Sequence, residues 1–253
     1  MTERYFHKRL GIDLRLGRWQ DVLADVQDVD LLFTSPPYNL KGGSNRNTKT
    51  DKCLSNGPQY ADDLPEDVYQ QQQHDALKTW MQMCAGAGVI AYNAKNRHRH
   101  GQILSPWSWF PTGLVVHDEV VLDRGSSHNH EPSFLQPTTE RLYIIKRTAG
   151  TRFWFDKRGQ RDLWTMPIKK RSDWNAWHSA PFALSFAEQV VKTYCKPNGL
   201  VCDPYSGSGT VAMACIRTGR RFVGSEADPD YFERSMAGIM DAVSHPYPAP
   251  VQS

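Results

Sequence analysis

The sequence predicts an α/β fold with a mostly parallel sheet, and three observations lead to this prediction. Short apolar runs alternate along the chain with stretches whose apolar residues have helical spacing, as in successive βα units. The run Leu31-Leu32-Phe33 is apolar on both faces, which is typical of a parallel strand covered by helices on both sides. A glycine-rich turn, residues 206–210, joins a further apolar run to a helical stretch.

The first half of the chain alternates between strand and helix patterns. Residues 12–16 alternate between apolar and polar side chains and predict a strand, and residues 19–26 have the spacing of a short helix. The doubly apolar strand follows at 30–33. A longer amphipathic stretch predicts a helix at 65–84, which leads into an apolar strand at 88–92.

The second half begins with a departure from this alternation. Residues 114–122 and 141–146 are both rich in Val, Ile and Leu and predict strands, and no helical pattern separates them. We therefore expect these two strands to pair antiparallel as a hairpin at one edge of the sheet. The remaining expected elements are a helix at 182–194, a strand at 200–202, a helix at 210–217, a strand at 221–223 and a helix at 229–242.

The bulk properties indicate a single domain, residues 1–253. A chain of 253 residues, 40% of them hydrophobic, can bury one large core. No apolar run approaches the roughly 18 residues of a membrane span, and the start MTERYFHKRL does not resemble a signal peptide. The five cysteines are scattered without a CxxC pair, so we expect a cytoplasmic protein with no structural metal. Residues 41–59 are expected to form a mobile loop and residues 245–253 a loose tail.

Positive charge is concentrated in one segment. Residues 146–171 contain nine basic and two acidic side chains and carry a net charge of +7, whereas the whole chain carries +3 and the remainder therefore −4. Aromatic residues, Phe153, Trp154, Phe155 and Trp164, are interleaved with the basic ones. This pattern favours contact with a polyanion over the alternative of a solvated basic surface.

The glycine-rich turn has the features of a ligand site. A strand leads into Asp203-Pro204-Tyr205-Ser206-Gly207-Ser208-Gly209-Thr210, a helix follows, and the next strand ends near Glu226. Glycines allow the backbone to approach a ligand, and an acidic residue after the second strand can accept hydrogen bonds from ribose hydroxyls. The spacing Gly207-x-Gly209-x-x-Ala212 also fits a dinucleotide fingerprint, but the carboxylate of Asp203 would repel a pyrophosphate and suits a cationic ligand better.

The end of the strand at 30–33 is a second unusual feature. The apolar run stops at Thr34-Ser35-Pro36-Pro37-Tyr38. Two prolines fix the backbone and remove two N–H donors, so the tip offers carbonyl groups, the Ser35 hydroxyl and the Tyr38 ring. By itself this tip is as consistent with a plain turn as with a functional site.

The two motifs together resemble those of the amino-group DNA methyltransferases, which methylate cytosine N4 or adenine N6. In this family a D-P-F-x-G-x-G-T motif binds S-adenosylmethionine and a [DNS]-P-P-[YF] motif holds the target base. The order here, with the catalytic motif first, resembles the permuted β subgroup. Residues 138–147, 178–191 and 223–235 resemble further family segments, so the resemblance extends over nearly the whole chain.

The resemblance implies a Rossmann-like fold of S-adenosylmethionine-dependent methyltransferases, with functional residues at matching positions. It assigns catalytic roles to Ser35, Pro36, Pro37 and Tyr38, and cofactor binding to Asp203, Pro204, Tyr205, Gly207, Ser208, Gly209, Thr210, Glu226, His178, Ala180 and Phe182. Two positions depart from the family pattern. Gly17 is followed by Arg18 where members often carry Asp, and Tyr205 replaces the commoner Phe.

The chemistry explains the composition of the tip. An exocyclic amine is a poor nucleophile because its lone pair is delocalised into the ring, whereas a sulfonium methyl is already reactive. The enzyme must therefore orient and rehybridise the amine, and Ser35 with a backbone carbonyl of Ser35 or Pro36 can accept both amine hydrogens. Tyr38 offers a stacking face. Because the amine is inaccessible in a duplex, the base must be flipped out, and the loop at 41–59 is expected to close over it.

The implied partner is double-stranded DNA. Residues 148–177 are expected to form a small basic target-recognition segment, with DNA contacts from Arg152, Lys157, Arg158, Arg161, Lys169, Lys170 and Arg171. A cognate restriction nuclease is a candidate partner, and the protein is expected to act as a monomer or homodimer, without a membrane, in a bacterial or phage-infected cell.

Several alternatives stay open. Ser35 in place of Asp favours cytosine N4, but adenine N6 enzymes also use this tip. A NAD-type oxidoreductase is compatible with the glycine spacing, and a DNA-binding protein without catalysis is compatible with Arg18. A protein or RNA methyltransferase is a further possibility, against which the basic segment favours nucleic acid in general.

Overall fold

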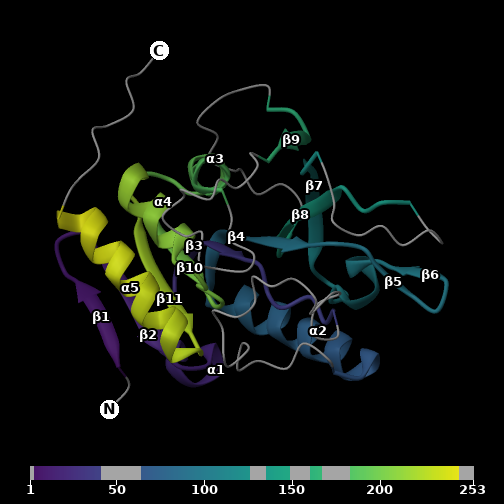
Figure 1. Ribbon diagram of the computed structural model, residues 1–253, viewed down its shortest axis with the longest axis horizontal. Coiled ribbons are helices and arrows are strands. Elements are labelled where there is room, and N and C mark those ends of the chain that lie inside the picture. Colours follow the sequence, from purple (N-terminus) through teal and green to yellow (C-terminus); the bar gives the residue numbers. More distant parts are fainter. Residues whose placement is uncertain (1–2, 41–63, 126–134, 149–159, 167–182, 245–253) are drawn as a thin grey trace, which may run out of the picture.

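The protein is organised around a nine-stranded sheet in the order β1-β2-β11-β10-β3-β4-β8-β7-β9 (Figure 1). The computed structural model describes residues 3–40, 64–125, 135–148, 160–166 and 183–244. The strands are β1 (Arg4–His7), β2 (Ile12–Leu16), β3 (Val29–Thr34), β4 (Cys84–Ala94), β7 (Val115–Asp123), β8 (Thr139–Lys146), β9 (Leu163–Thr165), β10 (Leu200–Asp203) and β11 (Arg221–Glu226). A separate hairpin pairs β5 (Arg97–Arg99) with β6 (Gln102–Leu104).

The middle of the sheet is parallel. Strands β2, β11, β10, β3 and β4 all run in one direction, so their carboxyl ends lie along the same edge. Strand β8 pairs antiparallel with both β4 and β7, as expected for the predicted hairpin. Because of this reversal, the first residues of β8 lie at the edge where the parallel strands end. This edge carries the candidate site.

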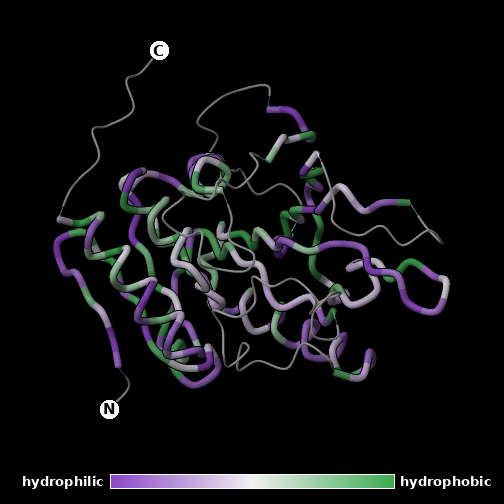
Figure 2. The backbone as a smooth tube through the Cα atoms, viewed as in Figure 1, coloured by the Kyte–Doolittle hydropathy of each residue, from purple (hydrophilic) through white to green (hydrophobic). Residues whose placement is uncertain are grey.

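Helices cover both faces of the sheet. On one face lie α3 (Leu184–Tyr194), α4 (Thr210–Thr218) and α5 (Pro229–Ser244), and on the other lie α1 (Trp19–Val22), α2 (Glu66–Met83) and the 3₁₀ helix η2 (Pro106–Trp109) (Figure 1). Strand residues alternate between the two cores: Leu31 and Phe33 face α3, whereas Leu32 faces α2. This period of two is why the central strands are apolar on both faces. Figure 2 shows the hydrophobic residues gathered along these inner strands.

Most predicted elements are confirmed, and the differences lie at the edges of the sheet. Helix α1 spans only Trp19–Val22 rather than residues 19–26. The short strands β1, β5, β6 and β9 lack a clear apolar period and were not predicted. Since β9 pairs parallel with β7, the predicted hairpin is not the outermost part of the sheet. The tail at 245–253 and the loop at 41–59 lie outside the described residues.

Arginine side chains satisfy the carbonyl groups at two helix ends. Arg147, just after β8, donates to the carbonyl oxygens of Ala85 (2.9 Å) and Cys84 (3.0 Å), and also to that of Met81. Arg220 donates from Nη2 to the carbonyl of Cys195 (2.9 Å) at the end of α3. A positive charge at the carboxyl end of a helix stabilises it. Arg147 therefore has a structural role, although its basic charge had suggested DNA contact.

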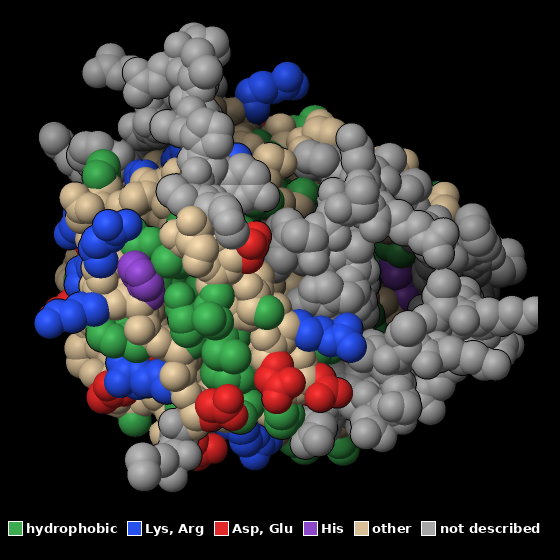
Figure 3. Space-filling view, turned by 60° about the vertical axis from the view of Figure 1, so that its left-hand side comes forward, with side chains coloured by type: hydrophobic (Ala, Val, Ile, Leu, Met, Phe, Trp, Pro, Cys, Tyr) green, Lys and Arg blue, Asp and Glu red, His purple; other side chains and the backbone are tan. Residues whose placement is uncertain are grey.

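The described part of the face in Figure 3 carries charges of both signs. Lys, Arg, Asp and Glu side chains border a hydrophobic strip. In the described part of the chain, no helix has both the length and the hydropathy needed to cross a lipid bilayer.

Candidate active site

The two sequence motifs lie side by side at the carboxyl edge of the sheet. Strand β10, which leads into the glycine turn, pairs directly with β3, which leads into the proline tip. The Thr34 hydroxyl donates to Oδ1 of Asp203 at 2.8 Å, and both residues are buried. A hydrogen bond thus joins two positions that are 169 residues apart in the chain.

The glycine turn is shaped by left-handed backbone and a close approach of two elements. Gly207 and Gly209 have φ angles of 53° and 76°, a region that favours glycine. A Cβ atom on Gly209 would lie 3.2 Å from Cβ of Ser235 in α5. Gly207 donates its N–H to Oε2 of Glu226 at 2.8 Å, which joins the turn to the end of β11. The turn therefore lies between two acidic side chains, and Gly207 is its half-buried residue.

The two carboxylates beside the glycine turn, Asp203 and Glu226, are both buried. Burial raises the pKa of Asp203 to about 7, although hydrogen bonds from Thr34 and Tyr205 act in the opposite direction. Burial likewise raises the pKa of Glu226 to about 7. Among the described residues, no Lys, Arg or His forms an ion pair with either group, and no hydrogen bond reaches Oδ2 of Asp203. A cationic ligand would supply the missing charge, so these residues fit the ammonium and sulfonium groups of S-adenosylmethionine.

An aromatic wall borders the same pocket. Trp19 donates its indole N–H to the Tyr205 hydroxyl at 3.2 Å, and the rings of Trp80 and Tyr205 meet edge to face at 6.1 Å. The Tyr205 hydroxyl is thus bonded to α1, a contact that the commoner Phe could not make. The backbone N–H of Gly17, next to Arg18, donates to the carbonyl of Glu226 at 2.8 Å, so the loop after β2 adjoins this pocket.

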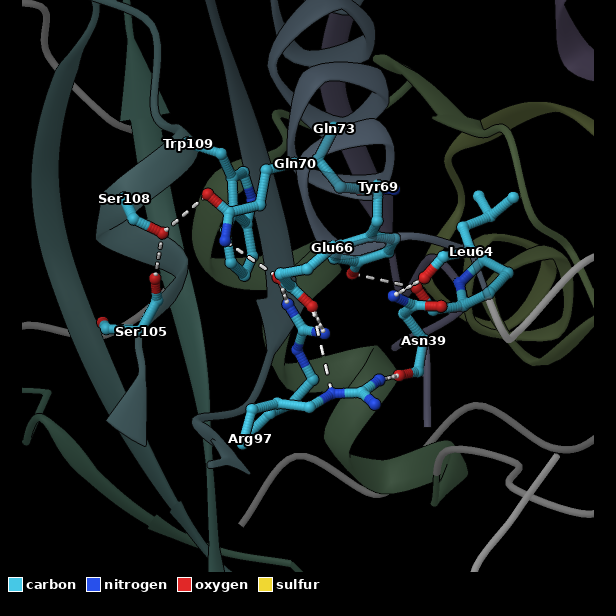
Figure 4. A network of polar contacts seen from close by, with 12 residues as sticks. Asn39, Leu64, Glu66, Tyr69, Gln70, Gln73, Arg97, Ser105, Ser108 and Trp109 are labelled. Carbon is cyan, nitrogen blue, oxygen red and sulfur yellow. Dashed lines mark hydrogen bonds and ion pairs between the residues drawn. The ribbon is translucent and has the colours of Figure 1, made fainter. Parts of the chain in front are cut away.

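The proline tip is held from several sides. The Tyr69 hydroxyl, from α2, donates to the carbonyl of Pro37 at 3.0 Å. Asn39 donates its side-chain amide to the carbonyl of Leu64 at 3.0 Å, so the two ends of the 40–64 segment meet beside the tip (Figure 4). The Ser35 and Tyr38 hydroxyl oxygens lie 2.9 Å apart. The tip is therefore a fixed platform rather than a free turn.

A matching family model covers most of the chain. The model described as DNA methylase matches residues 29–237, which include the proline tip, the glycine turn and Glu226. The chain belongs to the DNA methylase family. Enzymes of this family use S-adenosylmethionine as their methyl donor.

Relatives of this DNA methylase match over nearly its full length. The type II methyltransferase M2.LlaDCHI of Lactococcus lactis subsp. cremoris is 21% identical, and the match covers 92% of this chain and 90% of the relative. Among solved structures, the cytosine-N4-specific PvuII DNA methyltransferase has a TM-score of 0.71 at 14% identity and covers 92% of each chain. The M1.HpyAVI–SAM complex has a TM-score of 0.59 at 18% identity, covering 89% of this chain and 98% of its own.

Two buried residues of the DNA methylase site escaped the sequence analysis. Asn93 ends the apolar part of β4, and Glu140 is the second residue of β8. Asn93 donates to Oε2 of Glu140 at 3.0 Å and to the Tyr38 hydroxyl at 2.5 Å. A polar residue at the end of an apolar strand and an acidic residue at the start of another were the available signals, but only their place in the sheet shows that they meet.

The β5–β6 hairpin of the DNA methylase contributes a structural arginine. Arg97 is buried and pairs through both terminal nitrogens with Glu66, at 2.8 and 2.7 Å (Figure 4). Arg97 also lies 4.5 Å from the centre of the Tyr69 ring. It therefore supports the residue that holds the proline tip. Within the described residues, no group of three or more His, Cys, Asp or Glu could hold a metal.

Several predicted site residues of the DNA methylase lie outside the described part of the chain. These are His178, Ala180 and Phe182 for the cofactor, and Arg152, Lys157, Arg158, Lys169, Lys170 and Arg171 for DNA. Arg161 is described and exposed, and its carbonyl accepts a hydrogen bond from the Trp164 indole at 2.6 Å. Lys146, counted in the basic segment, is buried in β8 and cannot reach DNA. The cofactor and DNA contacts of the residues outside the described part of the chain, and the DNA contact of Arg161, stay predictions.

Proposed function

We propose that this protein transfers a methyl group from S-adenosylmethionine to N4 of cytosine in DNA. The observation that carries the proposal is the hydrogen bond of 2.8 Å between Thr34 and Asp203. This hydrogen bond joins β3, which ends at the proline tip, to β10, which leads into the glycine turn and its acidic side chains. A methyl donor bound beside Asp203 and an amine held at Ser35 would therefore be neighbours, as a direct transfer requires.

The residues of the pocket would hold the donor, which supplies an electrophilic methyl group on a sulfonium. Asp203 would face the cationic methionine part, and Glu226 would accept hydrogen bonds from the ribose. Tyr205, Trp19 and Trp80 offer an apolar aromatic border to the same pocket. The backbone of Gly207 and Gly209 allows a close approach without a side chain in the way.

The tip would hold the amine by accepting its hydrogens. The Ser35 hydroxyl oxygen and the carbonyl of Ser35 or Pro36 are the proposed acceptors, and the carbonyl of Pro37 is already engaged by Tyr69. Two acceptors would draw the amine nitrogen toward a tetrahedral geometry and aim its lone pair at the methyl group. The resulting thioether leaves with the electron pair of the broken carbon–sulfur bond, and the amine then loses a proton.

Two observations support cytosine N4 over adenine N6. The tip begins with Ser rather than Asp, and the structure with a TM-score of 0.71 is of a cytosine-N4-specific enzyme. We propose duplex DNA as the substrate, from which the target base is flipped into the site, and the basic segment at 148–177 as its contact.

The test is to identify the methylated nucleoside. The purified protein is incubated with S-adenosylmethionine and duplex DNA, and the DNA is digested and analysed by mass spectrometry. We expect N4-methylcytosine. If N6-methyladenine is the only product, the target base in the proposal changes from cytosine to adenine. If RNA or protein accepts labelled methyl groups and DNA does not, the proposal is overturned. The Ser35→Ala variant should lose activity but still bind S-adenosylmethionine, whereas a variant of the exposed Ser108 should keep both.

A further inference from the structure

A series of partly buried hydrogen bonds leads from the proline tip to a carboxylate. The Ser35 and Tyr38 hydroxyl oxygens are 2.9 Å apart, and the Tyr38 hydroxyl lies 3.4 Å from Oε2 of Glu140. Asn93 donates from the centre of this cluster to Tyr38 and Glu140, and lies 3.3 Å from the Ser35 hydroxyl. Asn93 and Glu140 are both buried and Ser35 and Tyr38 are half-buried, so water has limited access to these bonds.

The Glu140 carboxylate fixes which groups donate and which accept in this series of hydrogen bonds. Glu140 forms an ion pair through Oε1 with Arg124, so its other oxygen acts as an acceptor. The Tyr38 hydroxyl must then donate to Glu140 and accept from its other neighbours. The Ser35 hydroxyl is left to donate its proton to Tyr38, and its oxygen, 3.3 Å from the Asn93 amide nitrogen, keeps a lone pair for an incoming donor.

The donor–acceptor direction matters for the reaction because the Ser35 hydroxyl can either donate or accept a hydrogen bond. A serine that donates toward the substrate would bond the amine nitrogen and occupy its lone pair. A serine whose proton is already committed can only accept an amine hydrogen, which leaves the nitrogen lone pair free. Tyr38 keeps its proton for this purpose, since burial and the nearby Glu140 carboxylate raise its pKa well above the ordinary value.

We propose that Glu140 is a positioning residue that, acting through Tyr38, makes Ser35 a hydrogen-bond acceptor toward the target amine. The inference rests on the proposed function and adds to it a residue from β8, which none of the motifs contains. The sheet places it there, because β8 runs antiparallel to β4 and pairs Leu142 with Asn93. Glu140 does not touch the substrate in this proposal.

The test is the Glu140→Gln variant. Arg124 offers only donors, so the Gln carbonyl will turn toward Arg124 and the Gln NH₂ toward Tyr38. Tyr38 must then donate to Ser35, and Ser35 is turned to donate toward the amine. We expect kcat to fall by about 10- to 100-fold while KM for S-adenosylmethionine and for DNA changes by less than about twofold, because the binding surfaces are unchanged. The matched control is Glu119→Gln, on the neighbouring β7, which pairs with Arg141 at 2.9 Å and should leave kcat unchanged.

The same substitution in a Tyr38→Phe background distinguishes a positioning role for Glu140 from mere structural support. In Tyr38→Phe the ring stays but the relay hydroxyl is lost, so Glu140→Gln should cause little further loss of kcat in this background. Equal losses from Glu140→Gln in both backgrounds would overturn the inference, as would an unchanged kcat in the single variant. Each variant's melting temperature and S-adenosylmethionine affinity check that it is folded. If the wild-type protein methylates DNA and Glu140→Gln is fully active, only this inference fails; a wild-type protein without methylation of DNA overturns the proposed function as well.

Discussion

At the scale of single residues, the site is defined by polar groups buried without their natural partners. Asp203 and Glu226 lie in the pocket with raised pKa values and no nearby cation among the described residues, which is an unfavourable arrangement for the empty protein. Such an arrangement persists when the missing partner is a ligand. The cost of burying these carboxylates without a counter-charge should therefore be recovered when a cation binds.

The pH dependence of S-adenosylmethionine binding tests this interpretation. Burial raises the pKa of Asp203 from its ordinary value of 3.8 to about 7, so the folded state binds this proton more tightly than the unfolded state does. The resulting contribution to stability is fully present below the unfolded pKa and is lost as pH rises through 7. The cation needs the ionised form, so affinity should weaken by up to about tenfold per pH unit below pH 7. Calorimetry in buffers of different ionisation enthalpy should show proton release at pH 6. Equal affinity at pH 5.5 and pH 8 would contradict it.

The Asp203→Asn variant tests the same residue without changing pH. The amide keeps the acceptor for the Thr34 hydroxyl and the Tyr205 N–H but removes the charge. We expect the dissociation constant for S-adenosylmethionine to rise by about 10- to 100-fold. The melting temperature of the ligand-free variant at pH 8 should be equal or higher, because a buried charge is gone. A lower melting temperature with unchanged affinity would assign Asp203 a structural role instead.

At the scale of elements, the site depends on how strands and helices begin and end. The glycine turn begins α4, Arg147 satisfies the carbonyl end of α2, and Tyr69 in α2 holds the carbonyl of Pro37. The position of the proline tip is therefore linked to the packing of α2. The ends of elements, more than their interiors, carry the functional groups.

Gly209→Ala tests the glycine turn. Gly209 has φ of 76°, where an L-residue is strained, and the added Cβ would lie 3.2 Å from Ser235. We expect a loss of about 1–3 kcal/mol in the free energy of unfolding, measured by chemical denaturation. Gly219→Ala is a suitable comparison, because its φ is 70° but nothing lies within 4 Å of an added Cβ. A larger loss at Gly209 than at Gly219 measures the contact with α5, and equal losses would show that backbone strain alone is responsible.

Arg147→Met tests the capping of α2. The substitution keeps an apolar stem and removes the hydrogen bonds to the carbonyl groups of Met81, Cys84 and Ala85. We expect a loss of about 2–3 kcal/mol in the free energy of unfolding, with unaltered dependence of DNA affinity on salt. Arg9→Met, at an exposed position without a described partner, should change stability by less than about 0.5 kcal/mol. A reduced salt dependence for Arg147→Met would instead indicate that Arg147 contacts DNA.

At the scale of the whole molecule, the described fold and the basic segment have different predicted roles. The described face in Figure 3 mixes charges of both signs, whereas most of the predicted DNA-contacting residues lie in the basic segment outside the described residues. Lys146 is buried in β8 and Arg147 donates to carbonyl groups at the end of α2, so both have structural roles in the described fold. We expect affinity for duplex DNA to depend on this segment and affinity for the methyl donor to be independent of it.

Neutralising Lys169, Lys170 and Arg171 together tests this division. If each contacts a phosphate, the slope of log affinity against log salt concentration should become shallower by about 3. The affinity for S-adenosylmethionine should be unchanged. A triple variant at exposed basic residues far along the chain, Lys8, Arg9 and Arg234, is the control. An equal change of slope in the control would indicate a general charge effect rather than a binding segment.

The sequence by itself determined the fold class, the order of most elements and the two motifs, because these depend on local periodicity and turn chemistry. The apolar run before Ser35 and the glycines after Asp203 could be recognised where they stand. The edge strands escaped because they are short and half exposed, and their pairing depends on neighbours rather than on their own pattern.

Only the tertiary structure decided which residues meet. Glu140 is an acidic residue at the start of an apolar strand, a local signal that does not by itself assign a role, and Arg97 and Arg147 resemble any other basic surface residue. Their roles come from the antiparallel direction of β8, from the place where α2 ends and from the removal of water around their partners. A charge or hydroxyl acquires its function from the groups that surround it in three dimensions, and the order of elements in the sheet determines those groups.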